Sequence, residues 1–269
     1  MIVRECEKVN KSKIDWCDYT WNPVTGCYHG CEYCYARRIA ERFASEIYKK
    51  TKDIYALDFK ASLDEPIINN GKVEPYPHGF RPTLHKYRLK EPVEKTKGKK
   101  IFVCSMADLF GDWVPYKWIK QVFDICSKAP QHTYMFLSKN PGNMTHEMVY
   151  YSEKKKEKIW NKNNMWFGTS VTRQYDLARL GELHAFANNF VSIEPILGEI
   201  NIKKYIHWVD WVIIGAETGN RKDKVIPKKE WIQAIIDECR ANNVPVFLKN
   251  NLKWHEEIKE YPQRMLARE

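Results

Sequence analysis

Residues 133–139 read TYMFLSK, a continuous run of apolar and aromatic side chains that ends in a serine and a lysine. A run without polar alternation is typical of a strand that is buried on both faces of its sheet. Similar runs recur at 101–104, 165–171, 190–193, 211–215 and 244–248, and we expect a further, first strand around Trp16 to Thr20. Strands buried on both faces indicate a parallel sheet that is covered by helices.

Segments with helical periodicity separate most of these runs. Their apolar residues lie three or four positions apart, as on one face of a helix. The segments are Ile119 to Cys126, Leu177 to Ala187 and Trp231 to Cys239. Strands that alternate with helices predict an α/β protein with a partial or nearly closed (β/α) barrel of about six to seven parallel strands.

Domain organisation follows from the same pattern. Residues 15–269 are expected to form a single barrel domain after an amino-terminal tail over 1–14. The alternation of strands and helices is interrupted over 51–100, where prolines are frequent. This interval is predicted to be an irregular insertion over one end of the barrel.

The composition limits the class of protein. Lysine and arginine number 44 against 34 acidic residues, a formal net charge of +10 that is compatible with a polyanionic partner. The sequence has no apolar run of about 18 residues and no secretory signal at its start, so we expect a cytoplasmic protein without membrane contact. In that reducing compartment the eight cysteines are expected to be thiols or metal ligands.

Polar residues follow the carboxyl end of each predicted strand. Because parallel strands end at one rim of a barrel, these residues are expected to converge there, where β/α barrels build their sites. For any single residue, a turn or a helix cap is the alternative explanation. The residues are Ser105, Asp108, Ser138, Lys139, Thr169, Ser170, Glu194, Glu217, Lys249 and Asn250.

Three cysteines lie close together after the first predicted strand, in GCYHGCEYCY over 26–35. A closed zinc site needs four protein ligands, and no second CxxC pair follows Cys31 and Cys34. A zinc site with a distant fourth ligand, or a catalytic zinc with three ligands, stays open. Thiolates also hold iron–sulfur clusters, and three cysteines on a four-iron cluster leave one iron for another ligand.

The spacing C-x3-C-x2-C, with the aromatic Tyr33 before the third cysteine, resembles the motif of the radical S-adenosylmethionine (SAM) superfamily. The resemblance implies a 4Fe-4S cluster on Cys27, Cys31 and Cys34 whose open iron is chelated by SAM. It also implies that the reduced cluster passes one electron to the sulfonium and that a 5′-deoxyadenosyl radical then abstracts a substrate hydrogen. An external electron donor, such as a flavodoxin or ferredoxin, is expected as a partner.

Further stretches resemble a family of phage- and prophage-associated radical-SAM-like proteins, from about residue 15 to the end of the chain. Many members of that family have a longer gap between their first two cysteines than this chain has. The stretches are WNPVTGC, GCEYCYARR, IFVCSMADLFGDWVP, HTYMFLSKNP, MWFGTSV, FVSIEPILG, DWVIIGAETG and VPVFLKN.

The resemblance implies roles for several rim residues. Tyr33 is expected near the adenine, and SMAD, Ser105 to Asp108, replaces the usual GGE-like turn, so that Asp108 is the candidate for the SAM amino group. Lys139 is the candidate for the SAM carboxylate. Ser170 and Glu194 are candidates for the methionine or ribose hydroxyls, and Gly215 and Glu217 for the approach to the adenine.

The catalytic candidates are Lys139, Glu194 and Cys17. Cys17 lies ten residues before the first predicted ligand and is considered as a hydrogen-atom donor or a substrate-side thiol. A buried structural thiol is the alternative for Cys17. The same structural role is expected for Cys104, Cys126 and Cys239.

The substrate is predicted to be nucleic acid, for base modification or lesion repair. Arg81, His85, Lys86, Tyr87 and Arg88 lie in a basic, aromatic segment and are the candidates for phosphate contact and base stacking. One alternative is a radical SAM enzyme that acts on a small molecule or peptide. Another is a noncatalytic nucleic-acid-binding protein with a structural zinc or iron–sulfur site.

Overall fold

A computed structural model describes residues 12–51, 60–156, 158–159 and 162–266 of the chain. Its main sheet has seven strands, all parallel, whose order in the sheet is their order in the chain. They are β1 (Tyr19–Trp21), β7 (Lys100–Val103), β8 (Thr133–Ser138), β9 (Met165–Ser170), β10 (Asn189–Ile193), β11 (Val212–Ile214) and β12 (Val246–Leu248). The predicted partial barrel of parallel strands is confirmed.

The sheet is curled around an aromatic inner core. The ring of Trp16 lies 4.7 Å from that of Phe102 in β7, 6.2 Å from that of Phe190 in β10 and 6.2 Å from that of Trp211. Because β8 and β9 separate β7 from β10, one side chain can touch both only if the sheet is strongly curved. A Cβ atom at Gly168 would lie 2.6 Å from the Phe190 ring, so the glycine makes room for this packing.

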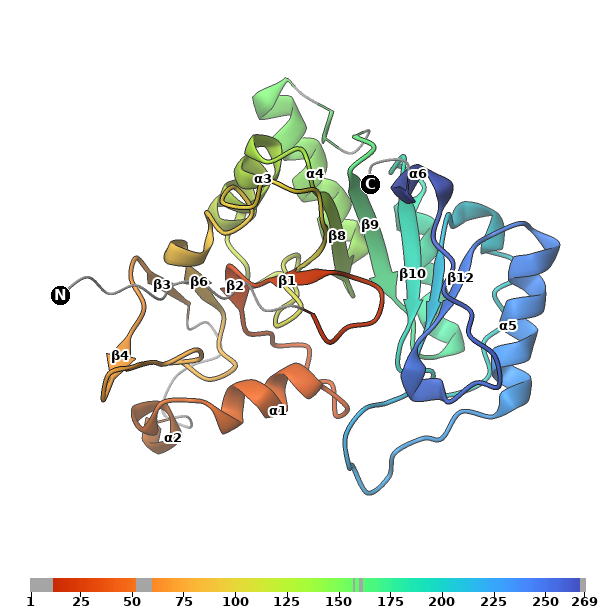
Figure 1. Ribbon diagram of the computed structural model, residues 1–269, viewed down its shortest axis with the longest axis horizontal. Helices are drawn as coiled ribbons and strands as arrows, with labels where there is room; N and C mark the ends of the chain where they lie inside the picture. Colours follow the sequence, from red (N-terminus) through yellow and green to blue (C-terminus); the bar gives the residue numbers. More distant parts are fainter. Residues whose placement is uncertain (1–11, 52–59, 157, 160–161, 267–269) are drawn as a thin grey trace.

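Helices cover the outer face of the sheet, with α3 and α4 together and α5 farther along (Figure 1). The second predicted helical segment forms a 3-10 helix, η3, instead of an α-helix. The helices on this face are α3 (Tyr116–Lys128), α4 (Pro141–Lys155), η3 (Gln174–Leu183), η4 (Ile206–Trp208) and α5 (Lys229–Ala241). Two short ones follow β12, η5 (Asn250–Leu252) and α6 (Gln263–Leu266).

The segment between β1 and β7 forms the part of the molecule beside the barrel, at the left of Figure 1. It contains helices α1 (Tyr35–Arg42), α2 (Glu46–Thr51) and η1 (Lys86–Arg88). A three-stranded sheet has the order β2 (Val24–Thr25), β6 (Thr83–His85), β3 (Ala61–Leu63), and β4 (Ile68–Asn69) pairs with β5 (Lys72–Val73). Within the predicted insertion over 51–100, residues 52–59 lie outside the described part of the chain, as do residues 1–11 of the predicted tail.

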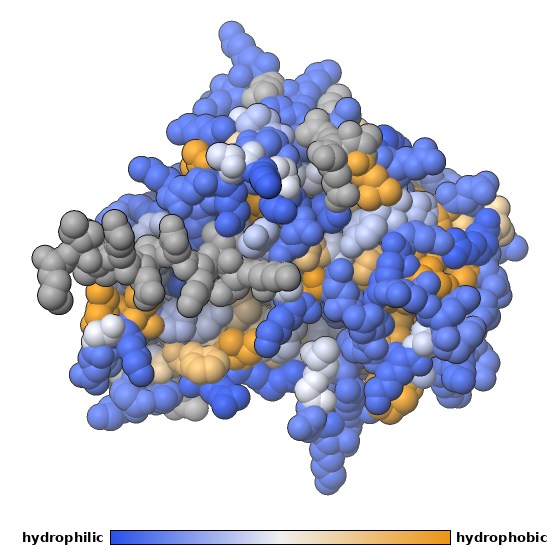
Figure 2. All heavy atoms as spheres, viewed as in Figure 1, coloured by the Kyte–Doolittle hydropathy of each residue, from blue (hydrophilic) through white to orange (hydrophobic). Residues whose placement is uncertain are grey.

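Polar side chains cover most of the face seen in Figure 2, and apolar ones form small separate areas. In the described ranges, no helix combines the length and the apolar character that crossing a membrane requires.

Candidate active site

The three cysteines lie on a loop at the carboxyl end of β1. The chain leaves β1 at Trp21, passes through β2 and Gly26, and enters α1 after Cys34. Gly26 has a φ of +93°, and a Cβ atom there would lie 2.3 Å from the backbone of Arg81, so the position requires glycine. The Gly26 N–H donates to the Met106 carbonyl at 2.9 Å. The loop is thereby fixed to the segment that follows β7.

The thiols of Cys27, Cys31 and Cys34 are free, partly buried, and face one cavity. Cys34 is the N-cap residue of α1, and its Sγ accepts a hydrogen bond from the Arg37 N–H at 3.3 Å. Burial raises the pKa of the Cys27 thiol to about 12 and also raises the pKa of Cys34. Metal binding would therefore release protons from these thiols.

The arrangement of the thiols bears on the choice between zinc and a cluster. In the part of the chain that the structure describes, no three His, Cys, Asp or Glu side chains form a set that could hold a metal ion. A single zinc ion needs ligands that converge on one point, whereas the thiolates of an iron–sulfur cluster bind separate iron atoms. Cys27, Cys31 and Cys34 are free and line one cavity, and zinc and a cluster both stay open on this geometry.

The cysteine loop forms one wall of a cavity of about 410 Å³ at the carboxyl ends of the strands, which we call the mouth cavity. Trp16, Phe102 and Leu137 supply apolar side chains to its lining. The polar strand-end residues that line it are Ser105, Asp108, Ser138, Lys139, Ser170, Ser192, Glu194, Glu217 and Lys249. The structure thus brings most of the predicted rim residues together with the cysteines.

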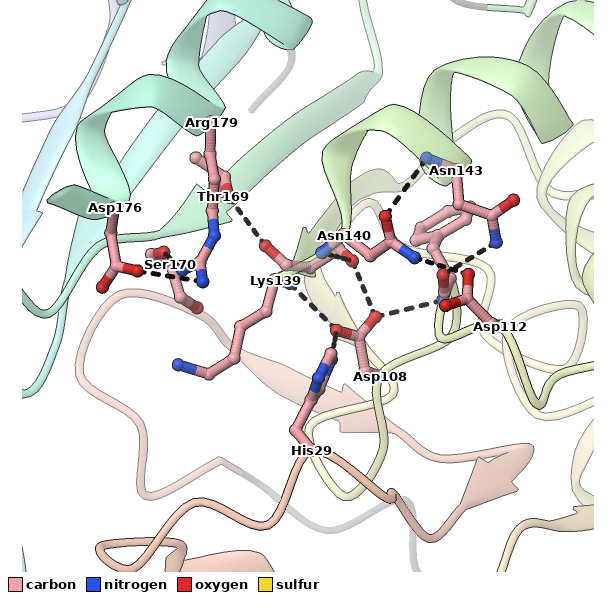
Figure 3. A network of polar contacts seen from close by, with 12 residues as sticks. His29, Asp108, Asp112, Lys139, Asn140, Asn143, Thr169, Ser170, Asp176 and Arg179 are labelled. Atoms are coloured by element: carbon pink, nitrogen blue, oxygen red, sulfur yellow. Dashed lines mark hydrogen bonds and ion pairs between the residues drawn. The ribbon is translucent and has the colours of Figure 1, made fainter. Parts of the chain in front are cut away.

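Asp108 is the centre of a buried polar network (Figure 3). Its Oδ2 accepts hydrogen bonds from His29 Nε2 at 2.7 Å and from the Lys139 N–H at 2.9 Å. Its Oδ1 accepts from the Ser138 hydroxyl at 2.7 Å and from the Phe110 N–H at 3.1 Å. Because His29 belongs to the cysteine loop, the network ties that loop to the segments that follow β7 and β8.

These contacts determine the chemistry of Asp108. Burial alone would raise the pKa of its carboxyl, but the hydrogen bonds from His29, Lys139 and Ser138 outweigh burial and hold the pKa below its ordinary value. Two donors on each oxygen use the acceptor capacity of a carboxylate. An ammonium group such as that of SAM could bind Asp108 only by displacing one of these donors.

A second contact holds the same loop. Lys139 Nζ donates to the Tyr33 hydroxyl at 2.7 Å and lies 5.2 Å from the centre of the Tyr33 ring. Burial lowers the pKa of Lys139, but Tyr33 outweighs burial and the net shift is upward, so the lysine is a cation. Figure 3 shows its side chain extending away from Asp108. Lys139 therefore offers a positive charge to the mouth cavity while its backbone supports Asp108.

Glu194 and Lys249 form an ion pair at the ends of β10 and β12. Their exposed side-chain fractions are 23% and 12%, so the pair is largely shielded from water. A Cβ atom at Gly215, the residue directly after β11 (the strand between them), would lie 2.9 Å from Lys249 and 3.0 Å from Glu194. Gly215, predicted to approach the adenine, therefore leaves space for this ion pair.

Glu217 is 2% exposed, and both its carboxylate oxygens accept hydrogen bonds from Arg221, at 2.8 and 2.9 Å. These hydrogen bonds lower the pKa of Glu217. Arg221 also lies 3.8 Å from Glu32, so it links the loop after β11 to the cysteine loop. Arg221 is not among the residues predicted from the sequence, where its spacing of four from Glu217 is the local signal for this ion pair.

Two predicted serines lie at the rim of the cavity. The Ser105 hydroxyl donates to Asn22 Oδ1 at 3.2 Å, and the Ser105 carbonyl accepts from the Tyr35 hydroxyl at 2.8 Å. The Ser170 carbonyl accepts from Arg179 Nη1 at 2.8 Å (Figure 3). Both serines thus support side chains from neighbouring segments.

Cys17, a predicted catalytic residue, packs in the inner core with Trp16 and Phe102. Its Sγ lies 3.2 Å from the Ser12 hydroxyl, and burial raises its pKa to about 12. The mouth cavity is lined by Trp16 and not by Cys17 in the described part of the chain. This placement favours the structural alternative for Cys17.

Two of the five residues predicted to contact nucleic acid, Arg81 and His85, are buried, whereas Lys86 is exposed. Arg81 is 8% exposed and His85 is fully buried, with its Nε2 2.9 Å from the Thr25 hydroxyl and its Nδ1 3.1 Å from the Tyr87 hydroxyl. Arg88 donates to the Asn22 and Pro75 carbonyls, and Lys86 pairs with Asp64 at 2.7 Å. These residues hold the small sheet beside the barrel, and the buried ones have no surface with which to meet a nucleic acid.

The curled sheet of seven parallel strands, with the candidate site at the carboxyl ends of the strands, is a partial (β/α) barrel. A family model described as "Protein of unknown function (DUF5131)" matches residues 11–268, so the chain belongs to this family. No curated protein matches the sequence. The phage association expected from the sequence stays a prediction.

Solved structures with the same fold include spore photoproduct lyase. The enzyme complexed with dinucleoside spore photoproduct superposes with a TM-score of 0.52 at 10% identity, over 91% of this chain and 80% of that chain. A tyrosine-to-phenylalanine variant gives 0.53 at 11% identity and a cysteine-to-serine variant 0.50 at 12%, with the same coverage. At these identities the likeness shows a shared fold.

Proposed function

We propose that the protein is a radical SAM enzyme that acts on nucleic acid, by base modification or lesion repair. The observation that carries the proposal is the position of the three cysteines. They lie on the loop after the first strand of a parallel half-barrel and face a cavity that apolar side chains and strand-end polar residues also line. Sites of β/α barrels lie at this end.

Cys27, Cys31 and Cys34 would hold a 4Fe-4S cluster. The donor set fits, because all three thiols are free, line one cavity and belong to a loop fixed at both ends. When bound and reduced by an external one-electron donor such as a flavodoxin or ferredoxin, the cluster supplies the electron that cleaves SAM into methionine and a radical able to abstract hydrogen. The protein residues position the loop and the cosubstrate around that chemistry.

The charged residues of the mouth cavity have different roles in binding SAM. The Lys139 ammonium, whose hydrogen-bond partner is the neutral Tyr33 hydroxyl, is placed to bind a carboxylate. Glu194, next to Lys249, is placed to accept from hydroxyls or from an ammonium group. Asp108 supports the cysteine loop through His29 and is a positioning residue in this proposal. Ser170 stays a candidate for the ribose.

Two facts support nucleic acid as the substrate. The formal net charge is +10, which favours a polyanion. A protein of the same fold, spore photoproduct lyase, has been solved complexed with dinucleoside spore photoproduct. A half-barrel with an open mouth can admit a nucleotide taken out of its stack.

The decisive experiment is anaerobic reconstitution followed by reduction with dithionite in the presence of SAM. The proposal predicts about four irons per chain and the release of 5′-deoxyadenosine. A preparation that binds one zinc and leaves SAM intact would support the noncatalytic alternative. For the substrate, products of incubation with a nucleic-acid digest are examined by mass spectrometry, and modified small molecules without any modified nucleotide would support the other alternative.

A further inference from the structure

Helix α1 presents its large apolar side chains to solvent. Tyr35, Ile39 and Phe43 are spaced by four residues along the helix and its carboxyl end, so they lie on one side, and they are 37%, 38% and 53% exposed. The small residues Ala36 and Ala40 face inward and are 5% and 0% exposed. A surface helix normally places its large apolar residues in the core, so the reversed arrangement marks an interaction surface.

This apolar side is continuous with the mouth cavity. Tyr35 and Ile39 belong both to the exposed side of α1 and to the lining of the cavity. The Tyr35 ring is held in place by the hydrogen bond from its hydroxyl to the Ser105 carbonyl at 2.8 Å. Since α1 begins directly after Cys34, the helix is also fixed relative to the predicted cluster. A ligand that reaches the mouth over this side meets a preformed apolar surface.

Arginines flank the same side. The helix sequence YARRIAER contains three arginines and one glutamate. The Arg42 guanidinium lies 5.5 Å from the centre of the Phe43 ring. Arg38 donates to the Thr218 carbonyl at 2.9 Å and so connects α1 with the loop after β11. The surface therefore combines flat apolar groups with positive charge.

We propose that Tyr35, Ile39 and Phe43, with Arg38 and Arg42, form a docking surface for the unpaired nucleotides next to the target nucleotide. The inference rests on the proposed function and deepens it, because it assigns the substrate strand a path over α1 into the mouth cavity. Bases stack on exposed apolar rings and guanidinium groups, and arginines bind the phosphates between them. This surface takes the place of Arg81 and His85, which are buried, as a nucleic-acid contact.

Charge complementarity favours a nucleic-acid strand over the other possible occupants. A second copy of the chain would bring the arginines of two α1 helices together, which costs energy through like-charge repulsion. A strand supplies the opposite charge and an apolar face in each nucleotide. The duplex lacks exposed base faces, so an unpaired strand is expected to bind more tightly at the same length.

The test measures binding of a fluorescent oligothymidylate of about 12 nucleotides, its RNA counterpart and a duplex of the same length, since a single-strand site covers roughly 4–16 nucleotides. Phe43→Ala is expected to weaken single-strand binding about 5- to 100-fold, on the scale of one lost stacking contact. Arg42→Gln is expected to lower the slope of log affinity against log salt by about 0.7. Comparison of the affinities for the DNA and the RNA oligonucleotide shows which of the two the surface binds more tightly.

The matched control is another exposed aromatic ring with a cation above it. Lys154 Nζ lies 5.4 Å from the Tyr150 ring on α4, on the outer face of the barrel. Tyr150→Ala and Lys154→Gln are expected to bind the oligonucleotide as the wild type does. Iron content and the unfolding midpoint verify that all four variants are loaded and folded.

Three results would overturn the docking surface. The first is that the wild-type protein binds no oligonucleotide. The second is that Phe43→Ala and Arg42→Gln bind it as tightly as the α4 control variants do. The third is that light scattering shows a wild-type dimer that Phe43→Ala dissociates. Reductive SAM cleavage by the wild type is measured on the same preparation. If SAM is cleaved and the α1 variants bind normally, the docking surface alone is wrong, whereas intact SAM refutes the proposed function itself.

Discussion

The two ends of the barrel both carry a cavity, and the larger one lies away from the cysteines. The mouth cavity measures about 410 Å³. A cavity of about 960 Å³ lies where β11 and β12 begin, and we call it the amino-end cavity. Its lining includes Asp210, Arg240, Glu260 and Arg264. Volume alone would select the end away from the cysteines.

The residues that line the two cavities also differ in their chemistry. At the amino end, Arg240 pairs with Glu260 at 2.6 Å and Arg264 with Asp210 at 3.1 Å, in exposed or half-exposed ion pairs. At the mouth, Asp108 is 6% exposed and stands beside three free thiols. Exposed ion pairs contribute little, whereas a buried carboxylate is costly unless it is hydrogen-bonded, as Asp108 is.

The largest expected effect comes from removing a thiol at the mouth. Cys31→Ala should abolish iron binding and SAM cleavage, because two thiolates cannot retain the cluster. Iron analysis and chromatography of 5′-deoxyadenosine measure both. Cys126→Ala removes a fully buried thiol of the outer core and should keep iron and cleavage. Equal iron content in the two variants would contradict the prediction that the thiols of the mouth bind iron and the buried thiol Cys126 does not.

Asp108→Asn is expected to have the next largest effect. The amide NH2 group of the asparagine would face groups that themselves donate hydrogen bonds to Asp108. The free energy of unfolding should therefore fall by about 2–4 kcal/mol. The cluster should also be lost faster. Urea denaturation and iron retention during dialysis measure these changes. Asp112→Asn, at an exposed acceptor of Asn140, is the control and should change stability by less than about 0.5 kcal/mol.

The same carboxyl gives a pH dependence. Since the folded pKa of Asp108 is below the ordinary value of 3.8, its ionised form stabilises the protein above that pH, and this contribution is lost as the pH falls through the folded value. Unfolding curves of wild type and Asp108→Asn should therefore converge in acid. Curves that stay parallel down to about pH 2 would show that the network does not depend on this ionisation.

Gly215→Ala tests the ion pair of Glu194 and Lys249 with a smaller expected effect. The added methyl would displace the ends of both side chains, which are flexible, so SAM affinity should fall about tenfold, or about 1.4 kcal/mol. Equilibrium dialysis with labelled SAM measures it. Gly198→Ala is the control, because a Cβ atom there meets nothing within 4 Å.

The smallest effect is expected at the amino end. Arg240→Ala breaks a half-exposed ion pair and should cost about 0–1 kcal/mol of stability, with SAM cleavage as in the wild type. Thermal unfolding and the cleavage assay measure the two quantities. If Arg240→Ala impaired cleavage more than Gly215→Ala does, the functional contrast between the two cavities would be wrong.

The sequence predicted the barrel well because its strands are buried on both faces. Runs such as TYMFLSK lack the alternation of polar and apolar residues that a strand with one solvent-exposed face would show, and all six clear runs contain strands of the sheet. Tyr35, Ile39 and Phe43 repeat every four residues, which is the spacing of one helix face, and α1 begins directly after Cys34. This periodicity does not show whether the helix face is buried or faces solvent. That depends on whether another segment packs on it, which is determined by the tertiary structure.

The site was predictable only where strand ends fix position. Lys139, Glu194 and Lys249 follow strands directly, so their convergence follows from parallel topology. The contact between His29 and Asp108 joins residues 79 positions apart and leaves no local signal. The burial of Arg81 and His85 could not be predicted for the same reason, since it depends on the strands that pair with their segment. A nucleic-acid contact of Lys86, Tyr87 and Arg88 stays a prediction.

The central claim is that three cysteines hold a four-iron cluster with one iron open to SAM. Electron paramagnetic resonance of the reduced, anaerobically reconstituted protein, recorded before and after SAM is added, tests it most directly. The account predicts the signal of a reduced 4Fe-4S cluster that changes when SAM binds. A zinc protein without that signal, or a cluster spectrum that SAM leaves unchanged, would contradict it.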